Sequence, residues 1–337
     1  MENLELAIRQ IKEAMPGLEI HENEPLSRHC SFHIGGPARI IAVPSSVSSL
    51  SKICHYLKLN HLAPYILGNG TNILFPDEGL SELFIISTEK LTKMFLLDSG
   101  DIYVEAGVSL AKLASFAQQN SLSGLEFASG IPGTVGGGLM MNAGAYGGEM
   151  KDVVQSVVLY YLPEQRLYEL NNEQCRFGYR KSLFQEMGGC VLLSAVIRCP
   201  KGDGAEIAAK MRELNERRRD KQPLDLPSAG SAFRRPEGYF AAALIEEAGL
   251  KGFSVGGAQV SEKHSGFVVN TGNASSHDVY ELMMHIRKTV FEHSGVVLEP
   301  EMIILPPDYK LADHGPAVPL HNVRPNMPAQ EETEQEH

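Results

Sequence analysis

The chain has 337 residues, of which 43% are hydrophobic and 21% charged, and its formal net charge is −11. This length is sufficient for two or three domains with buried cores. The acidic balance argues against nonspecific nucleic-acid binding, because the phosphate backbone would be repelled. A local basic cluster can still bind a small anion within one cleft.

The sequence shows no signal for export, membrane insertion or metal binding. The first residues, 1–6, lack the basic and apolar segments of a signal peptide. No apolar run approaches the roughly 18 residues that a membrane span requires. The five cysteines are odd in number and form no C-x-x-C pair, a pattern typical of reduced thiols. We therefore expect a cytoplasmic protein with no metal, membrane or nucleic-acid partner.

Residues 1–96 predict a first unit of α+β character. Hydrophobic spacing gives, in order, a helix over 1–20, a strand over 38–43, a helix capped by Ser45 or Ser46, and strands over 65–67 and 83–87. Alternation of helix and strand in this part indicates a small sheet covered by helices.

Residues 97–202 predict a second unit and residues 203–305 a third. In the second we expect a strand over 102–106, a helix from Ser109 to about Asn120, and strands over 157–162 and 191–198. In the third we expect helices over 205–219, 239–247 and 277–293, with strands over 266–269 and 302–305. Residues 306–337 are rich in Pro and Glu and poor in apolar residues, which predicts a disordered tail.

Two glycine-rich stretches carry the strongest functional signal. One spans residues 128–148 and the other is Gly68-Asn-Gly-Thr-Asn72. Glycines let the backbone adopt positive φ, and successive N–H groups in such turns can hold phosphate oxygens. Two such loops suit the diphosphate of a dinucleotide, whereas the alternative is a pair of tight structural turns. No G-x-G-x-x-G is present, because Ile73 stands where the third glycine should be, so we expect no Rossmann fingerprint.

Seven segments together resemble one known family. They are Ser31–Ala38, Gly68–Asn72, Gly130–Gly137, Met141–Gly148, Phe177–Ser182, Ala229–Phe233 and Leu298–Glu301. In this order they are similar to the UDP-N-acetylenolpyruvoylglucosamine reductase family, flavoenzymes of bacterial peptidoglycan precursor synthesis. The match extends over about residues 24–305. The segment Gly256–His264 resembles the shorter of the family's two subtypes.

The resemblance implies an α+β fold with a two-subdomain FAD-binding module of the vanillyl-alcohol-oxidase type and a C-terminal α+β substrate domain. The subdomains would be residues 1–96 and 97–202, and the substrate domain residues 203–305. It also implies FAD as cofactor, NADPH and UDP-N-acetylglucosamine enolpyruvate as substrates, and a cytoplasmic monomer serving cell-wall synthesis, cell shape and cell division. His29 and His33 suggest a covalent flavin link, but the matched segments favour non-covalent FAD.

The resemblance also implies the reacting residues. Arg180 matches the arginine that polarises the substrate carboxylate, and its planar fork suits that group. Ser231 matches the proton donor, and Glu301 matches the glutamate that acts beside it. Glu299 is the alternative to Glu301 for this role, because residues two apart in a strand face the same side.

Further residues are expected to bind the cofactor or the nucleotide. The cofactor set is Gly68, Asn69, Gly70, Thr71, Asn72, Gly130, Ile131, Gly133, Thr134, Gly136, Gly137, Asn142 and Ala145. The substrate set is Tyr179, Lys221 and Arg235. Lys221 also fits a solvated helix end favoured by the helix dipole. Arg235 stands where the family usually has an amide that contacts the diphosphate.

Two other functions are consistent with the flavin loops. One is an oxidase of the same architecture acting on an alcohol or a sugar, and the other is a non-catalytic flavin- or nucleotide-binding protein. Neither needs a proton donor. The joint occurrence of Arg180, Ser231 and Glu301 in matched segments favours the reductase.

Overall fold

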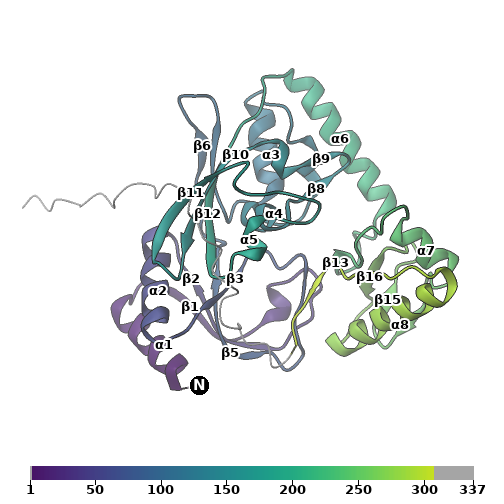
Figure 1. Ribbon diagram of the computed structural model, residues 1–337, viewed down its shortest axis with the longest axis horizontal. Coiled ribbons are helices and arrows are strands. Elements are labelled where there is room, and N and C mark those ends of the chain that lie inside the picture. Colours follow the sequence, from purple (N-terminus) through teal and green to yellow (C-terminus); the bar gives the residue numbers. More distant parts are fainter. Residues whose placement is uncertain (1, 307–337) are drawn as a thin grey trace, which may run out of the picture.

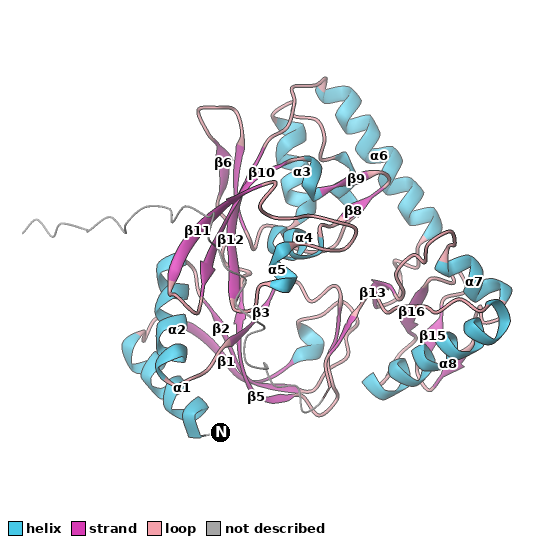
Figure 2. Cartoon of the chain, in the orientation of Figure 1, coloured by secondary structure: helices cyan, strands magenta, loops and turns pink. Residues whose placement is uncertain are grey.

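The computed structural model describes residues 2–306 and contains three main sheets with helices packed around them (Figure 1). Helices and strands are mixed along the chain, and antiparallel strand pairs predominate (Figure 2). The α+β class predicted from the sequence is therefore confirmed.

The first sheet has the strand order β1-β2-β5-β3, with helices α1 and α2 against it. Its elements are α1 (Glu2–Ala14), β1 (Glu19–Pro25), β2 (Pro37–Val43), α2 (Val47–Leu59), β3 (Pro64–Leu67) and β5 (Leu80–Ser87). The helix cap is Ser46, whose hydroxyl accepts a hydrogen bond from Ser49 N. The predicted helices and strands are present, but the first helix ends at Ala14 instead of near residue 20, and β1 begins at Glu19. Strand β1 was not predicted, because its charged sequence lacks an apolar face.

The apolar faces of α1 and α2 are buried against the first sheet. Ile11 and Ile53 lie in one cluster with Ile40 and Ile86 of the sheet. Tyr160 and Val191 of the second sheet belong to the same cluster. The first and second sheets therefore share a core.

The second sheet is antiparallel, with the order β11-β10-β12-β7-β6. Its strands are β6 (Met94–Leu96), β7 (Ile102–Glu105), β10 (Val154–Tyr161), β11 (Arg166–Asn171) and β12 (Cys190–Ile197). Its helices are α3 (Leu110–Gln119), α4 (Val135–Met141) and α5 (Leu183–Glu186), together with the 3-10 helix η2 (Glu126–Gly130). The predicted cap of α3, Ser109, accepts from Lys112 N.

Helix α4 corrects the interpretation of residues 128–148 as a continuous loop. Three glycines lie within this helix despite their low helix propensity. A Cβ at Gly136 would lie 3.1 Å from Ala106 Cβ, and one at Gly138 would lie 3.2 Å from Leu110. These glycines let α4 pack closely on its neighbours, so tertiary packing overrides propensity here.

The third sheet has the order β13-β16-β15-β14 and carries α7 and α8. Its elements are β13 (Ser228–Ser231), α7 (Ala241–Glu247), β14 (Ser254–Val255), β15 (Ala258–Val260), β16 (Phe267–Asn270) and α8 (Ser276–Ser294). Gly295 ends α8 in the left-handed conformation, at φ 72°, which glycine adopts readily.

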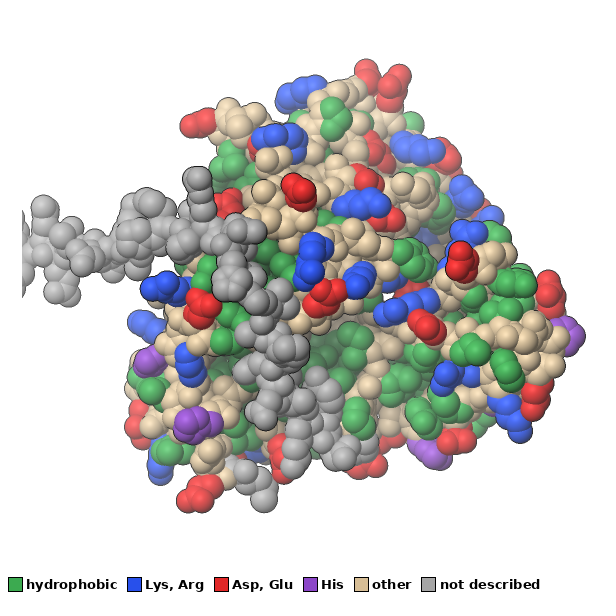
Figure 3. Space-filling view, in the orientation of Figure 1, with side chains coloured by type: hydrophobic (Ala, Val, Ile, Leu, Met, Phe, Trp, Pro, Cys, Tyr) green, Lys and Arg blue, Asp and Glu red, His purple; other side chains and the backbone are tan. Residues whose placement is uncertain are grey.

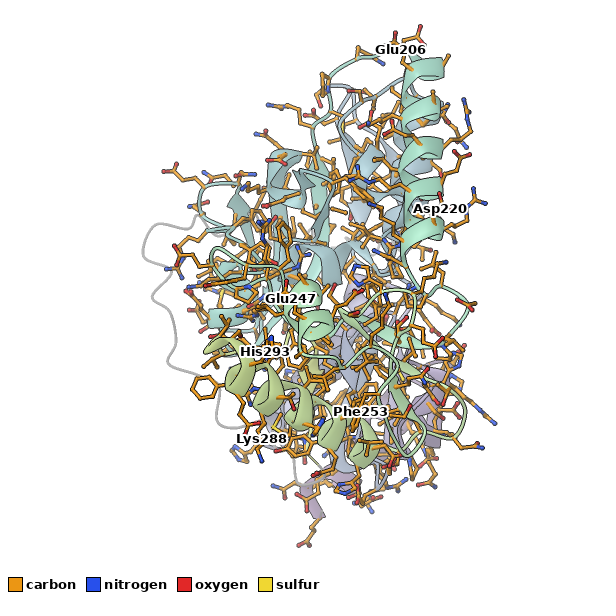
Figure 4. All side chains as sticks on the ribbon, turned by 90° about the vertical axis from the view of Figure 1, so that its right-hand side faces the viewer. Glu206, Asp220, Glu247, Phe253, Lys288 and His293 are labelled. Atoms are coloured by element: carbon orange, nitrogen blue, oxygen red, sulfur yellow. The ribbon has the colours of Figure 1, made fainter. Side chains whose placement is uncertain are left out.

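Helix α6 (Gly204–Lys221) connects the second and third sheets. It runs from Glu206 at one end of the molecule to Asp220 near the third unit (Figure 4). It lies against α3 and η2, and a Cβ at Gly130 would lie 2.5 Å from Asn215 Oδ1. Although we expected this helix to open the third domain, it packs on the second unit.

The last described segment returns to the first unit. Pro300 bridges Phe233 beside the third sheet, and β17 (Ile303–Ile304) then pairs in parallel with β4 (Ile73–Leu74). Leu298, Met302 and Leu305 belong to one apolar cluster with residues of the first and third sheets. The tail expected over 306–337 lies, apart from Pro306, outside the described residues.

Charged side chains of both signs are interspersed over the face shown in Figure 3. The net charge of −11 therefore does not form a single acidic field on this face. Within residues 2–306, no helix combines the length and the apolar character needed to cross a bilayer.

The shared core generates a stability prediction for α2. Ile53 is completely buried, so Ile53→Ala should lower the free energy of unfolding by about 2–5 kcal/mol through lost burial and a residual cavity. Leu59 ends the same helix and is 59% exposed, so Leu59→Ala should change it by less than about 0.5 kcal/mol. Urea unfolding followed by circular dichroism measures both, and equal effects would contradict the packing described.

Candidate active site

The two glycine-rich loops predicted from the sequence lie in contact. Thr71 Oγ1 donates to Pro132 O at 3.1 Å. A Cβ at Gly68 would approach Thr134 Oγ1 to 2.7 Å, so only glycine permits this approach. Residues 61 positions apart, Thr71 and Pro132, therefore belong to one continuous backbone surface.

This surface is rich in backbone N–H donors. Among the described residues, the N–H groups of residues 69–72 and of Gly133 and Thr134 have no hydrogen-bond acceptor. Gly70 and Gly133 have φ of 57° and 137°. Clustered N–H groups in such turns form concave anion sites. The residues present therefore fit the diphosphate of a dinucleotide such as FAD.

Two of the expected donors are used elsewhere. Gly136 N donates to Ala106 O at 2.8 Å, and Gly137 N donates to the capping hydroxyl of Thr134 at 3.2 Å. Both glycines lie in the first turn of α4 and their N–H groups bond within the protein, so their contact with a cofactor stays a prediction. Ile131 N likewise donates to Ala128 O.

A cation that was not singled out from the sequence lies beside the second loop. Arg218 of α6 is half-buried, and burial lowers the pKa of its guanidinium. It forms no ion pair with a residue in the described part of the chain. Its Cδ would lie 3.1 Å from a Cβ at Gly130. With Gly130, Pro132 and Asn215 it lines a cavity of about 580 Å³, where an anion would compensate the charge.

The central contact of the site is an ion pair between Arg180 and Glu301. Arg180 Nε donates to Glu301 Oε1 at 2.6 Å, with side-chain exposures of only 22% and 13%. Arg180 Nη2 also approaches Gly144 O at 3.4 Å. A charge-assisted hydrogen bond of this length fixes both groups.

The structure distinguishes Glu301 from its neighbour Glu299. The Glu299 side chain is 72% exposed and lies 3.8 Å from Arg234. Glu301 N donates to Ala232 O at 2.9 Å, and Asn72 Nδ2 donates to Glu301 O at 3.2 Å. The backbone around Pro300 forms a single bridge rather than a regular strand, so residues two apart need not face the same side.

Ser231 is linked to this contact through the backbone. It is the last residue of β13, it is exposed, and it precedes Ala232, whose carbonyl holds Glu301. Gly230 has φ 79°, which turns the strand at this point. Ser31 Oγ donates to Ser228 O at 2.7 Å and ties β13 to the first unit.

The three residues expected to bind the substrate have different surroundings. Tyr179 Oη accepts from Arg235 N at 3.4 Å, and Arg180 Cζ lies 5.2 Å from the Tyr179 ring centroid. The Arg235 guanidinium stacks on Phe240 at 4.0 Å. Lys221 ends α6, and its ammonium has no hydrogen-bond or ion-pair partner within residues 2–306.

Asn142 differs from its expected role. It is completely buried, and within residues 2–306 its amide bonds to Glu149, Lys151 and Gly178. Because these partners hold the amide within the protein, it supports the structure of the site, and its predicted contact with a cofactor stays a prediction. Ala145 lies in the two-residue strand β8 (Gly144–Ala145), beside the carbonyl that Arg180 approaches.

Comparison with known proteins gives a consistent result over most of the chain. Residues 38–168 match the model of an FAD binding domain, and residues 222–305 match that of the UDP-N-acetylenolpyruvoylglucosamine reductase C-terminal domain. The UDP-N-acetylenolpyruvoylglucosamine reductase of Caldanaerobacter subterraneus is 48% identical over 302 residues, which is 89% of this chain and 98% of that protein. The chain belongs to the UDP-N-acetylenolpyruvoylglucosamine reductase family.

Other relatives agree with this assignment. The reductase of that name from Clostridioides difficile is 46% identical over 86% of this chain and 94% of its own. The crystal structure of the Thermus caldophilus reductase matches with a TM-score of 0.72 and 32% identity, covering 86% of this chain and 99% of that chain. The family and the two-part fold inferred from the sequence are confirmed.

The matched regions agree with the packing. The FAD-binding match contains both glycine loops, and the C-terminal match begins at residue 222, directly after α6. This boundary fits the finding that α6 packs on the second unit.

The loop geometry generates a prediction for FAD binding. A Cβ at Gly70 would lie 2.2 Å from His29 O, and φ 57° disfavours any side chain. Gly70→Ala should therefore distort the loop and weaken FAD binding by about 10-fold or more, since one strained residue costs about 1–3 kcal/mol.

Gly17→Ala is the matched control, because nothing lies within 4 Å of its Cβ position and its φ is not in the left-handed region. Quenching of FAD fluorescence by apoprotein measures affinity, and thermal melting checks that each variant folds. A folded Gly70→Ala protein with unchanged affinity would exclude this loop from the cofactor site.

Proposed function

We propose that the protein is an FAD-dependent enzyme that uses NADPH to reduce UDP-N-acetylglucosamine enolpyruvate to UDP-N-acetylmuramate. The observation that carries this proposal is the Arg180–Glu301 pair, held directly beside the glycine loops by the Asn72–Glu301 hydrogen bond. A carboxylate-binding arginine next to a flavin site suits reduction of a double bond conjugated to a carboxylate. The reaction class is that of an oxidoreductase acting on a CH–CH group with NADP as acceptor.

FAD would be held without a covalent link. The N–H groups of residues 69–72, Gly133 and Thr134 would bind its diphosphate, and Arg218 would contribute a positive charge. The chemistry that FAD supplies when bound is transfer of a hydride, taken from NADPH, to C3 of the enolpyruvyl group. The remaining steps fall to side chains of this protein.

Arg180 would bind the substrate carboxylate and stabilise the negative charge that develops on it and on C2. Its Nε is committed to Glu301, while Nη1 has no partner among the described residues. A fixed guanidinium in a partly buried site stabilises such charge without reorganisation during the reaction. Glu301 keeps the guanidinium in one orientation.

Ser231 would donate the proton to C2. A serine hydroxyl is a weak acid, so it depends on neighbouring groups to stabilise or replace the proton. Ala232 ties its backbone to that of Glu301. Ser231, Glu301 and Arg180 are thus linked by one backbone hydrogen bond and one ion pair.

The UDP diphosphate would lie toward the third unit, near Tyr179, Arg235 and Lys221. Stacking on Phe240 and the Nε contact with Tyr239 O fix the Arg235 guanidinium without neutralising it. Lys221 supplies an uncommitted ammonium at the end of α6. We place this activity in the cytoplasm, in a monomer that makes peptidoglycan precursor for cell-wall growth and division.

Anaerobic spectroscopy tests this function against the oxidase alternative. The purified protein should be yellow, NADPH should bleach the flavin band, and the enolpyruvyl substrate should restore it without oxygen. A protein that needs oxygen for reoxidation, or whose flavin is reduced by an alcohol or a sugar, would be an oxidase. A colourless protein that does not take up FAD would contradict both functions.

The role of Ser231 predicts separate effects on the two half-reactions. Ser231→Ala should leave flavin reduction by NADPH within about threefold and slow reoxidation by substrate about 10²–10⁴-fold, the usual contribution of a general acid. Stopped-flow absorbance measures each half-reaction. Ser254→Ala, an exposed serine of β14, should change neither. Equal loss of both half-reactions in Ser231→Ala would contradict the assigned role.

The two glutamates provide a matched pair of variants. Glu301→Gln should slow reoxidation by substrate about 100-fold or more, because the amide removes the charge that orients Arg180. Glu299→Gln should change it by less than about threefold, since this side chain is largely solvated. Substrate-driven reoxidation rates measure both, and the reverse order would overturn the choice of Glu301.

A further inference from the structure

Helix α4 follows the second glycine loop in the chain, and its C-terminal end is hydrogen-bonded to the turn that carries Arg180. Thr134, in that loop, caps the helix at its N-terminus. Asn142 ends it at φ 44°, in the left-handed conformation that asparagine tolerates better than most residues. The cofactor loop and the arginine turn therefore lie at opposite ends of one short, rigid element.

The Arg180 turn is strained and depends on outside contacts. Arg180 has φ 52°, a conformation that an arginine rarely adopts. Gly178 N donates to Lys181 O and Lys181 N donates back to Gly178 O, which closes the turn tightly. Such a conformation persists only where surrounding structure determines it.

Asn142 makes the central contact with this turn. Its Nδ2 donates to Gly178 O at 2.9 Å and to Glu149 Oε2 at 2.7 Å, while its Oδ1 accepts from Lys151 N at 2.9 Å. The residue has 0% exposure. A buried amide with all these partners satisfied has one orientation, so it fixes Gly178 relative to the end of α4.

Two further side chains tie the same turn to the same helix end. Ser182 Oγ donates to Met140 O at 2.6 Å. Gln185 Nε2 donates to Met140 O at 2.8 Å and to Arg180 O at 3.1 Å. The turn is therefore anchored at residues 178, 180 and 182, and in each case the anchor is linked to residues 140–142.

We propose that Asn142 is a positioning residue for Arg180: through α4 it fixes the distance between the guanidinium and the loop that holds the cofactor diphosphate. This inference rests on the proposed function, in which Arg180 binds the substrate carboxylate. Displacement of a reacting group by about 1 Å can cost about 100-fold in rate. A side chain that touches neither ligand thus controls the substrate step.

The chain offers variants that separate this role from helix stability. Asn142→Gly removes the amide but accepts positive φ, so α4 can still end at residue 142. Asn142→Asp keeps the shape and the acceptor but places a carboxylate against Glu149 and Gly178 O. Asn172→Ala is the control: this asparagine of the same unit also donates two amide bonds, to Lys151 O and Val154 O, but none to the Arg180 turn.

We expect Asn142→Gly and Asn142→Asp to bind FAD and to be reduced by NADPH within about threefold of wild type. Calorimetry should show that their affinity for UDP-N-acetylmuramate falls about 10-fold, and stopped-flow should show that reoxidation by substrate slows about 10–100-fold. Asn172→Ala should show neither effect. Ser182→Ala, which removes one lesser anchor, should show a smaller loss of the same kind.

A double-variant cycle decides between positioning and an independent effect. Arg180→Ala combined with Asn142→Gly should be no slower in the substrate step than Arg180→Ala alone, because Asn142 acts through Arg180. Additive losses, or an FAD affinity that falls as far as the product affinity, would overturn the inference. If Arg180→Ala itself left the substrate step unchanged, the proposed function of Arg180 would fail first.

Discussion

The ion pair between Arg180 and Glu301 brings together residues 121 positions apart and therefore depends on the whole path of the chain. Arg180 is presented by a turn of the second unit, and Glu301 by a segment that leaves the third sheet and continues into a strand pair with the first unit. The pair forms only when all three units are assembled. In the proposed function, a flavin and a nucleotide sugar would bind between these sheets. The apolar cluster shared by the first and third units holds the sheets in place.

Much of this organisation follows from local sequence patterns. Helical spacing predicted α2 and α8 correctly, and capping residues predicted where α2 and α3 begin. Burial of one face and capping are local properties, so a short stretch of sequence carries them. Strand β1 and helix α4 were missed for opposite reasons. Strand β1 is charged and is stabilised by pairing with β2. Helix α4 is rich in glycine, and it is stabilised because its glycines pack closely against Ala106 and Leu110.

The site shows a similar division. The glycine loops, Arg180 and Glu301 could be proposed from motifs, yet their contacts could not. Periodicity placed Glu299 and Glu301 on one side of a strand, whereas the irregular backbone at Pro300 separates them. Arg218 was not predicted, since its significance comes from burial beside Gly130 with no acidic partner among residues 2–306. Asn142 looked like a ligand because of its position in a glycine-rich motif, while its hydrogen bonds show that it supports the Arg180 turn.

A crystal structure of the protein with FAD and UDP-N-acetylmuramate bound would test the central claim most directly, because the claim concerns which groups meet in one place. The account predicts the cofactor diphosphate on the N–H groups of residues 69–72, Gly133 and Thr134, and the lactyl carboxylate on Arg180. A diphosphate bound away from both loops, or a carboxylate out of reach of that guanidinium, would contradict it.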